Sequence, residues 1–296
     1  MMEVSKSGYY KWLNRSPTER DVKRVEAVSL VTEIHAAHKS HGYRWTAAFI
    51  RLNCSVRISD NFVYKIFRIY GLRAETKHRT KYKHRKMRDK YPNLIFTTWE
   101  TVDRPRQVIV SDMTAFWTGY KYWELTMYFD VFTKQILSWS LSYKRGDRRT
   151  YINGLKDLLE ILDGVPDENH ITVIHTDQGS VYASVAYNKL ITDPNIKRSM
   201  SRAGKPTDNP INESLNGWIK EELFLDFNLD KRDDIPQTIA KYIDFYNEMR
   251  PCYALGYDIP NHYEQRYRNG ELEKKDTFRN RVLSETPKFV QKKRST

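Results

Sequence analysis

The chain has 296 residues, of which 40% are hydrophobic, so it can bury a sizeable core and is long enough for two domains. No apolar run approaches the roughly 20 residues needed to cross a bilayer, which excludes a membrane-spanning protein and favours a cytoplasmic one. The two cysteines, Cys54 and Cys252, are too few for a disulfide framework or a four-thiolate zinc site.

The net charge of +13 is unevenly distributed along the chain. Residues 1–106 hold 23 Lys and Arg against 10 Asp and Glu, and residues 266–296 hold 10 against 4. Residues 107–265 are acidic, with 17 Lys and Arg against 23 Asp and Glu. Basic flanks suit contacts with phosphates and an acidic centre suits divalent cations, although charge runs are also ordinary solvated surfaces. This distribution favours a nucleic acid as the partner.

The N-terminal part of the chain is predicted to be helical. Residues 18–38 carry apolar side chains at helical spacing, and residues 41–52 and 59–70 are expected to form two helices joined by a short turn. Ser59 suits the N-cap of the last helix and Gly71 its C-cap. Two helices joined by a short turn within a basic segment predict a helix-turn-helix. The alternative is a small helical bundle that does not contact DNA. The exposed candidates for contacts with phosphates or base edges are Asn61, Tyr64, Lys65 and Arg68.

A zinc-binding module in this part of the chain is not favoured. His35 and His38 are close together, but a zinc site would also need a nearby pair of cysteines, and only Cys54 is available. We therefore interpret both histidines as ordinary helix residues.

Residues 77–90 form a basic run without apolar periodicity, which is typical of a linker that lies along a DNA backbone. The candidates for phosphate contacts in this run are Lys81, Lys83, Arg85 and Lys86.

The central part of the chain is predicted to be α/β. Strands are expected at residues 107–116, 122–131, 136–142, 171–175 and 196–200. Helices are expected at residues 148–162, 181–191 and 234–249 and around Glu213. Three strands in an antiparallel meander are followed by alternating helices and strands, which is typical of an α/β domain.

Three acidic residues lie at special places in these elements. Asp112 is in the middle of the first predicted strand, and Asp177 follows the fourth strand at the edge of the sheet. Asn209 and Pro210 suit the N-cap and first residue of a helix that begins just before Glu213. A single acid is usually a surface charge, but three acids in these positions predict a metal site, because Mg²⁺ binds hard oxygen ligands.

The helix that contains Glu213 is predicted to have two faces, taking 100° per residue. The face expected to dock on the core consists of Ile211, Leu215, Trp218 and Ile219. The face expected to look back toward the sheet edge consists of Glu213, Asn216, Gly217 and Lys220. Asn209 and Asn216 are expected to support the site.

Thirty-five residues separate Asp177 from Glu213. This spacing, with two acids on strands and one on a helix, resembles the D-D-35-E integrase core of insertion-sequence transposases and retroviral integrases. Three further motifs resemble the second reading frame of one bacterial transposase group, and the resemblance covers nearly the whole chain. They are His-Thr-Asp-Gln-Gly-Ser-Val-Tyr at 175–182, Ser-Met-Ser-Arg-Ala-Gly at 199–204 and Tyr-Asn-Glu-Met-Arg-Pro at 246–251.

The resemblance implies a ribonuclease-H-like integrase core, with a mixed five-stranded sheet and flanking helices, preceded by an all-α helix-turn-helix region. The implied organisation is a helix-turn-helix region at 1–76, a basic linker at 77–104, a catalytic core at 105–265 and a basic tail at 266–296.

The implied activity is that of a DDE polynucleotidyl transferase, which cleaves and joins DNA strands with Asp112, Asp177 and Glu213 as catalytic residues and metal ligands. Two Mg²⁺ ions about 3.5 to 4 Å apart are expected, with Mn²⁺ as a substitute. Asp112 would bridge both ions, Asp177 would complete one coordination sphere, and Glu213 the other. Lys220 matches a basic residue of the family and would hold a DNA phosphate.

The implied partners are double-stranded DNA at element ends and target sites, further copies of the chain assembled on DNA, and an upstream-frame product that is fused or associated. The implied location is the bacterial cytoplasm, at the nucleoid when DNA is bound. One alternative is a catalytically silent DNA-binding repressor derived from a transposase. Another is a stand-alone ribonuclease H, which would not explain the 35-residue spacing or the basic helix-turn-helix.

Overall fold

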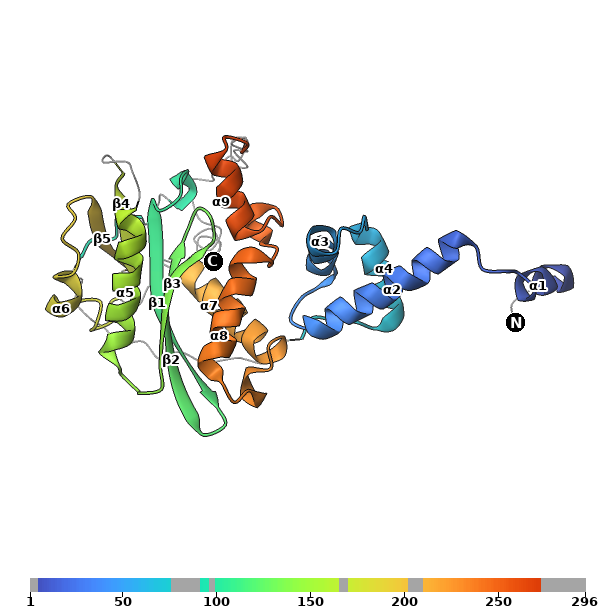
Figure 1. The fold of residues 1–296 in the computed structure, drawn as a ribbon, viewed down its shortest axis with the longest axis horizontal. Coiled ribbons are helices and arrows are strands. Elements are labelled where there is room, and N and C mark those ends of the chain that lie inside the picture. The colour runs from blue at the N-terminus through green and yellow to red at the C-terminus, as the bar shows by residue number, and fades with distance from the viewer. Residues whose placement is uncertain (1–4, 76–90, 96–98, 165–169, 202–209, 273–296) are drawn as a thin grey trace, which may run out of the picture.

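The computed structural model describes residues 5–75, 91–95, 99–164, 170–201 and 210–272, without the side chains of residues 100 and 210–214. In these residues a helical N-terminal region lies beside an α/β core (Figure 1). No helix in the described ranges is both long and apolar enough to cross a membrane.

The N-terminal region contains four helices, of which the last three pack on one another. They are α1 (Lys6–Leu13), α2 (Glu19–Ala37), α3 (Tyr43–Asn53) and α4 (Asp60–Tyr70). Ser59 caps α4 by accepting a hydrogen bond from the Phe62 N–H, and Gly71 ends it in the left-handed conformation at φ 65°. Val31, Ile50 and Val63 are fully buried between α2, α3 and α4. The predicted helices at 18–38, 41–52 and 59–70 are confirmed.

The core is built on a mixed sheet with the strand order β3-β2-β1-β4-β5. Its strands are β1 (Val108–Thr118), β2 (Lys121–Asp130), β3 (Ile136–Ser142), β4 (Thr172–Thr176) and β5 (Ile196–Met200). The pairs β1–β2 and β2–β3 are antiparallel, whereas β1–β4 and β4–β5 are parallel. The predicted mixed five-stranded sheet is therefore confirmed.

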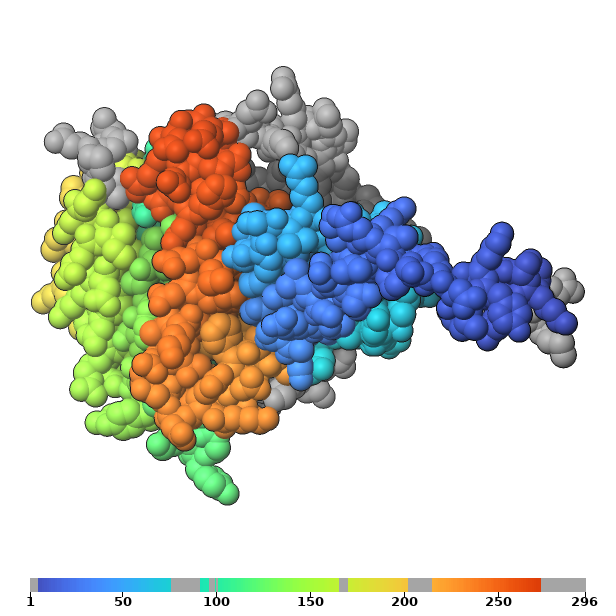
Figure 2. Space-filling view, turned by 45° about the vertical axis from the view of Figure 1, so that its right-hand side comes forward, coloured from blue at the N-terminus to red at the C-terminus, as the bar shows by residue number. Residues whose placement is uncertain are grey.

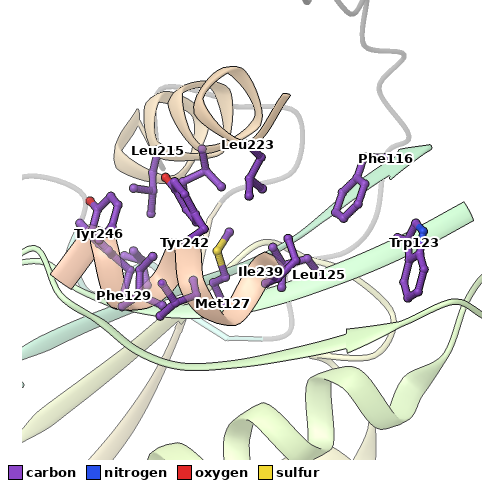
Figure 3. Close-up of a cluster of buried hydrophobic side chains, with 14 of the residues drawn as sticks. Phe116, Trp123, Leu125, Met127, Phe129, Leu215, Leu223, Ile239, Tyr242 and Tyr246 are labelled. Atoms are coloured by element: carbon purple, nitrogen blue, oxygen red, sulfur yellow. The ribbon is translucent and has the colours of Figure 1, made fainter. Parts of the chain in front are cut away.

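Helices cover both faces of the sheet. Helix α5 (Arg148–Asp163) packs on one face, and α7 (Pro210–Leu225) and α8 (Ile235–Glu248) pack on the other (Figure 1). The interior on the α7 and α8 side is apolar; the side chains that meet there include Leu125, Met127, Phe129, Leu215, Leu223, Ile239, Tyr242 and Tyr246 (Figure 3). Because each fully buried large apolar side chain contributes about 1.5 to 3 kcal/mol, this layer holds α7 firmly on the sheet.

The helix predicted at 181–191 is much shorter than expected. Only α6 (Val185–Asn188) is helical, and Ser184 caps it by accepting from the Tyr187 N–H. The Asn188 amide donates to the carbonyls of Tyr182 and Ser184, so it competes with the backbone for the carbonyls at and before the cap. The prediction was wrong in extent because periodicity does not detect these side-chain bonds to the backbone.

Helix α9 (Pro260–Arg268) was not predicted, because its sequence is polar and lacks an apolar stripe. It is held by a buried ion pair between Glu264 and Arg106 and by the packing of Phe132 against Tyr263. The core therefore continues through residue 268, past the expected start of the basic tail at 266.

Candidate active site

Two of the predicted acids are brought together by parallel strand pairing. In the pair β1–β4, Ser111 is the register partner of Thr176, and Asp112 and Asp177 are the residues that follow. Asp112 is half-buried and Asp177, just beyond the end of β4, is exposed. The sheet thus places two of the predicted metal ligands on neighbouring strands, next to each other where β4 ends.

The protonation of these two carboxyl groups is linked. Burial raises the pKa of Asp112 to about 7, and the neighbouring Asp177 carboxylate is the second cause. The pKa of Asp177 is also raised, by loss of hydration. Two like charges in one site repel each other, and a divalent cation between hard oxygen ligands would remove that repulsion. The donor set therefore fits Mg²⁺ or Mn²⁺.

Helix α7 contributes two polar side chains to Asp112. Asn216 Nδ2 donates a hydrogen bond of 2.9 Å to Asp112 Oδ2. Lys220 is half-buried; burial lowers its pKa, while the negative charge of Asp112 acts in the opposite direction. The expectation that Asn216 and Lys220 look toward the sheet edge agrees with these contacts.

The docked face of α7 differs from the predicted one at Trp218. Leu215 and Ile219 are buried, as expected, but Trp218 is 49% exposed. The buried face is centred on Leu215, Ile219 and Leu223, so Trp218 lies at its margin. The side chain of Ile211 lies outside the described residues.

The third predicted acid, Glu213, lies in the first turn of α7, but its side chain is outside the described part of the chain. Asn209, the expected N-cap, also lies outside the described residues. Among the side chains that the structure describes, no group of three or more His, Cys, Asp or Glu is arranged to hold a metal. The role of Glu213 therefore stays a prediction.

The loop after β4 holds Asp177 in place. The Gly179 N–H donates a hydrogen bond of 2.9 Å to Asp177 Oδ1. A Cβ atom at position 179 would lie 2.9 Å from the same oxygen and 3.3 Å from the Tyr182 ring, so a side chain there would displace the carboxylate. On the other strand, the Tyr182 hydroxyl hydrogen-bonds Ser111 Oγ at 2.9 Å, directly before Asp112. No role was predicted for Gly179 or Tyr182 from the sequence. Both residues belong to the 175–182 motif, which was the only sequence feature that pointed to them.

The predicted DNA-contact residues divide into two groups. The side chains predicted on α4 are all exposed: Asn61, Tyr64, Lys65 and Arg68. Within this group Arg68 lies beside Tyr64, with Nη1 3.5 Å from the hydroxyl. The linker candidates lie outside the described residues: Lys81, Lys83, Arg85 and Lys86. Contact with DNA stays a prediction for both groups.

Three histidines lie near the junction of α2 and α3; His35 and His41 are buried and His38 is half-buried. His35, His38 and His41 are packed among aromatic rings, and burial lowers the pKa of each. The interpretation of His35 and His38 as ordinary helix residues stays a prediction.

Comparison with known proteins identifies relatives over most of the chain. Residues 102–206 and residues 195–260 match two families that are both described as integrase core domain. The chain is 29% identical over 257 residues to the transposase for insertion sequence element IS904 of Lactococcus lactis, which covers 86% of this chain and 99% of that protein. It is 25% identical over 253 residues to the putative transposase InsK for IS150 of Escherichia coli K12, covering 84% and 85%. Among solved structures, it is similar to the HTLV-2 integrase catalytic core domain in complex with magnesium, with 19% identity, a TM-score of 0.42 and coverage of 54% and 97%.

Proposed function

Because the chain belongs to the insertion-sequence transposases that carry an integrase core domain, we propose that it cleaves DNA strands and transfers them through Asp112, Asp177 and Glu213. The observation that carries this proposal is the adjacency of Asp112 and Asp177 on parallel strands, with α7 packed beside them. Their raised pKa values support a site that is completed by a cation.

We propose that Asp112, Asp177 and Glu213 hold two Mg²⁺ ions, with Mn²⁺ as a substitute. When bound, the metal neutralises charge on the phosphodiester and activates the attacking oxygen. The donors of Asn216 and Gly179 hold the Asp112 and Asp177 carboxylates in fixed orientations, so the site is organised in advance. Pre-organised ligands reduce the conformational cost of binding.

We propose that Lys220 binds a DNA phosphate. It lies one turn after Asn216 on α7, where burial lowers its pKa and the negative charge of Asp112 opposes that shift. A water attacks the first phosphodiester and frees a 3′-OH, and that 3′-OH attacks a second phosphodiester. Each step exchanges one P–O bond for another, so no covalent intermediate on the protein is required.

The exposed side chains of α4 and the basic run at 77–90 are the proposed contacts with double-stranded DNA at element ends and targets. Assembly of several copies on paired ends, together with an upstream-frame product, belongs to the same proposal.

A cleavage assay separates this function from that of a silent repressor. A labelled DNA fragment that carries the ends of the element encoding this chain is incubated with the protein, with Mg²⁺ or with a chelator. We expect a nick at the end of the element only with Mg²⁺. A repressor would bind the same fragment and leave both strands intact.

A further inference from the structure

The N-terminal region is fastened to the opposite end of the helix that contains Glu213. Asp226 directly follows α7, and its carboxylate accepts two hydrogen bonds from Ser40, which lies between α2 and α3. The Ser40 N–H donates at 3.0 Å to Oδ1, and Ser40 Oγ donates at 2.6 Å to Oδ2. Ser40 is 3% exposed, so these bonds are shielded from water. We call this pair the Ser40–Asp226 clasp.

A second acid stands one turn earlier on α7. Glu222 is fully buried and forms an ion pair with Arg250, whose Nη2 lies 2.6 Å from Oε1. The Tyr242 hydroxyl donates to Glu222 Oε2 at 3.0 Å. From the N-terminal region, His41 Nε2 lies 3.3 Å from Glu222 Oε1 and 3.6 Å from Asp226 Oδ2. The clasp is therefore part of a polar cluster that ties α7 to α8 and to the N-terminal region.

Helix α3 makes further contacts with the chain that follows α8. Trp45 Nε1 donates to the Pro251 carbonyl at 3.1 Å, and Asn53 Nδ2 donates to the Met249 carbonyl at 3.1 Å. The His38 ring stacks on Phe245 of α8 with centroids 5.2 Å apart. In the space-filling view the N-terminal region, in blue, lies directly over the orange helices (Figure 2).

We propose that the Ser40–Asp226 clasp makes the helix-turn-helix and α7 one rigid unit, so that DNA bound by α4 meets the catalytic acids in a fixed position. This inference rests on the proposed function. Ser40 and Asp226 are positioning residues in this account, because they act through α7 and do not touch the acids.

The length of α7 connects the clasp at its C-terminal end to Glu213 at its N-terminal end. The helix has 16 residues and is about 24 Å long, with Glu213 in its first turn and Asp226 just past its last. A tilt at one end therefore changes the position of the other. Misplacement of reacting groups by about 1 Å can lower a rate about 100-fold. The hydrogen bonds of Trp45 and Asn53 join α3 to the segment that follows α8, whereas the two hydrogen bonds to the Asp226 carboxylate join the N-terminal region directly to the end of α7. Hydrogen bonds are directional, so this pair sets the register between the N-terminal region and α7.

Four variants separate positioning from general stability. Asp226→Ala removes both hydrogen bonds, and Ser40→Ala removes only the one from the hydroxyl. Asp226→Asn is the conservative variant, because its carbonyl accepts from the Ser40 N–H and its amide can donate to Ser40 Oγ. Asp157→Ala, at an exposed position on α5 across the sheet, is the matched control.

The first readout needs no activity. Spin labels are placed at Glu26→Cys on α2 and Lys241→Cys on α8, both exposed, with Cys54 and Cys252 changed to Ala. We expect one narrow distance distribution in the labelled parent, in Asp226→Asn and in Asp157→Ala, and a broad one in Asp226→Ala. A narrow distribution in Asp226→Ala would overturn the clasp.

The second readout is the single-turnover cleavage rate at saturating DNA. We expect Asp226→Ala to lower this rate about tenfold or more and Asp226→Asn to restore it to within about threefold of the parent. The affinity for non-specific DNA should change less than about twofold, because the basic surface is intact. Unchanged cleavage by Asp226→Ala would overturn the positioning role.

The two readouts also separate this inference from the proposed function. A parent protein that binds DNA without cleaving it would refute the proposed function and with it the positioning role, while the distance measurement would still decide whether the clasp holds. If circular dichroism shows that Asp226→Ala does not fold, Ser40→Ala is judged by the same two criteria.

Discussion

Asn216 on α7 donates a hydrogen bond of 2.9 Å to Asp112 on β1 and so joins the helix that contains Glu213 to the strand that contains the central acid. Replacing this amide with a methyl group leaves the Asp112 carboxylate with one fewer fixed partner. Groups that orient metal ligands typically contribute 10-fold to 100-fold to metal affinity.

Asn216→Ala should therefore raise the Mg²⁺ concentration that gives half-maximal cleavage by about tenfold or more. A Mg²⁺ titration of the nicking rate measures this change, with Asn153→Ala, at an exposed position on α5, as the control. An unchanged midpoint would remove Asn216 from the site.

Gly179→Ala should abolish or strongly lower cleavage, because the new Cβ would lie 2.9 Å from Asp177 Oδ1 and force the carboxylate to move. The fold itself should lose little stability, because the atom that must move is the end of an exposed side chain. Gly217→Ala is the matched control, since nothing lies within 4 Å of a Cβ at that position and alanine favours a helix. Thermal unfolding and nicking are measured on both variants; equal behaviour would show that Gly179 has no special role.

The sequence predicted the fold correctly where a local pattern of residues determines the structure. A β-branched apolar run at residues 108–110 indicated β1, and Ser59 and Gly71 indicated the ends of α4 because caps are local. The adjacency of Asp112 and Asp177 depends on the parallel pairing of β1 with β4, which was not predicted from the sequence.

Other features depend on contacts between distant residues. Ser40 and Asp226 are 186 residues apart, and no periodicity or motif links them. Helix α9 is held by Arg106, 158 residues before its partner Glu264. Trp218 has helical spacing with the docked residues but lies at the margin of the face, which only the packing of α7 decides.

Lys65→Ala and Arg68→Ala should each weaken DNA binding and reduce the slope of log affinity against log salt by about 1, because each removes one phosphate contact. Both side chains are exposed on α4. Fluorescence anisotropy between low and moderate salt measures the slope. Lys156→Ala, at an exposed position on α5, should leave the slope unchanged. If all three variants behave alike, the main DNA surface lies away from α4.

The stability of the folded protein should depend on pH through the protonation of Asp226. Burial raises its pKa from 3.8 to about 7, so its contribution to stability is fully present below about pH 4 and is lost as the pH rises through 7. Nearby, burial lowers the pKa of His38 to about 4, and its contribution is instead lost as the pH falls from 6.5.

Comparison of the parent with Asp226→Asn isolates the acid, because both proteins retain the histidines. The stability of the parent relative to Asp226→Asn should increase as the pH falls from 8 to 5.5. Denaturant unfolding at several pH values measures the difference. A difference that stays constant with pH would mean that Asp226 is ionised in the folded protein.

The most direct test of the account is Mg²⁺-dependent cleavage by Asp112→Ala, Asp177→Ala and Glu213→Ala, each measured beside its affinity for DNA. Each acid is proposed to supply metal ligands that no neighbour replaces, whereas the proposed DNA contacts lie on α4 and in the basic run at 77–90. The account predicts that all three variants bind DNA nearly as the parent does and that none of them cleaves it. Cleavage at near-parental rates by any one of the three would contradict the assignment of the site.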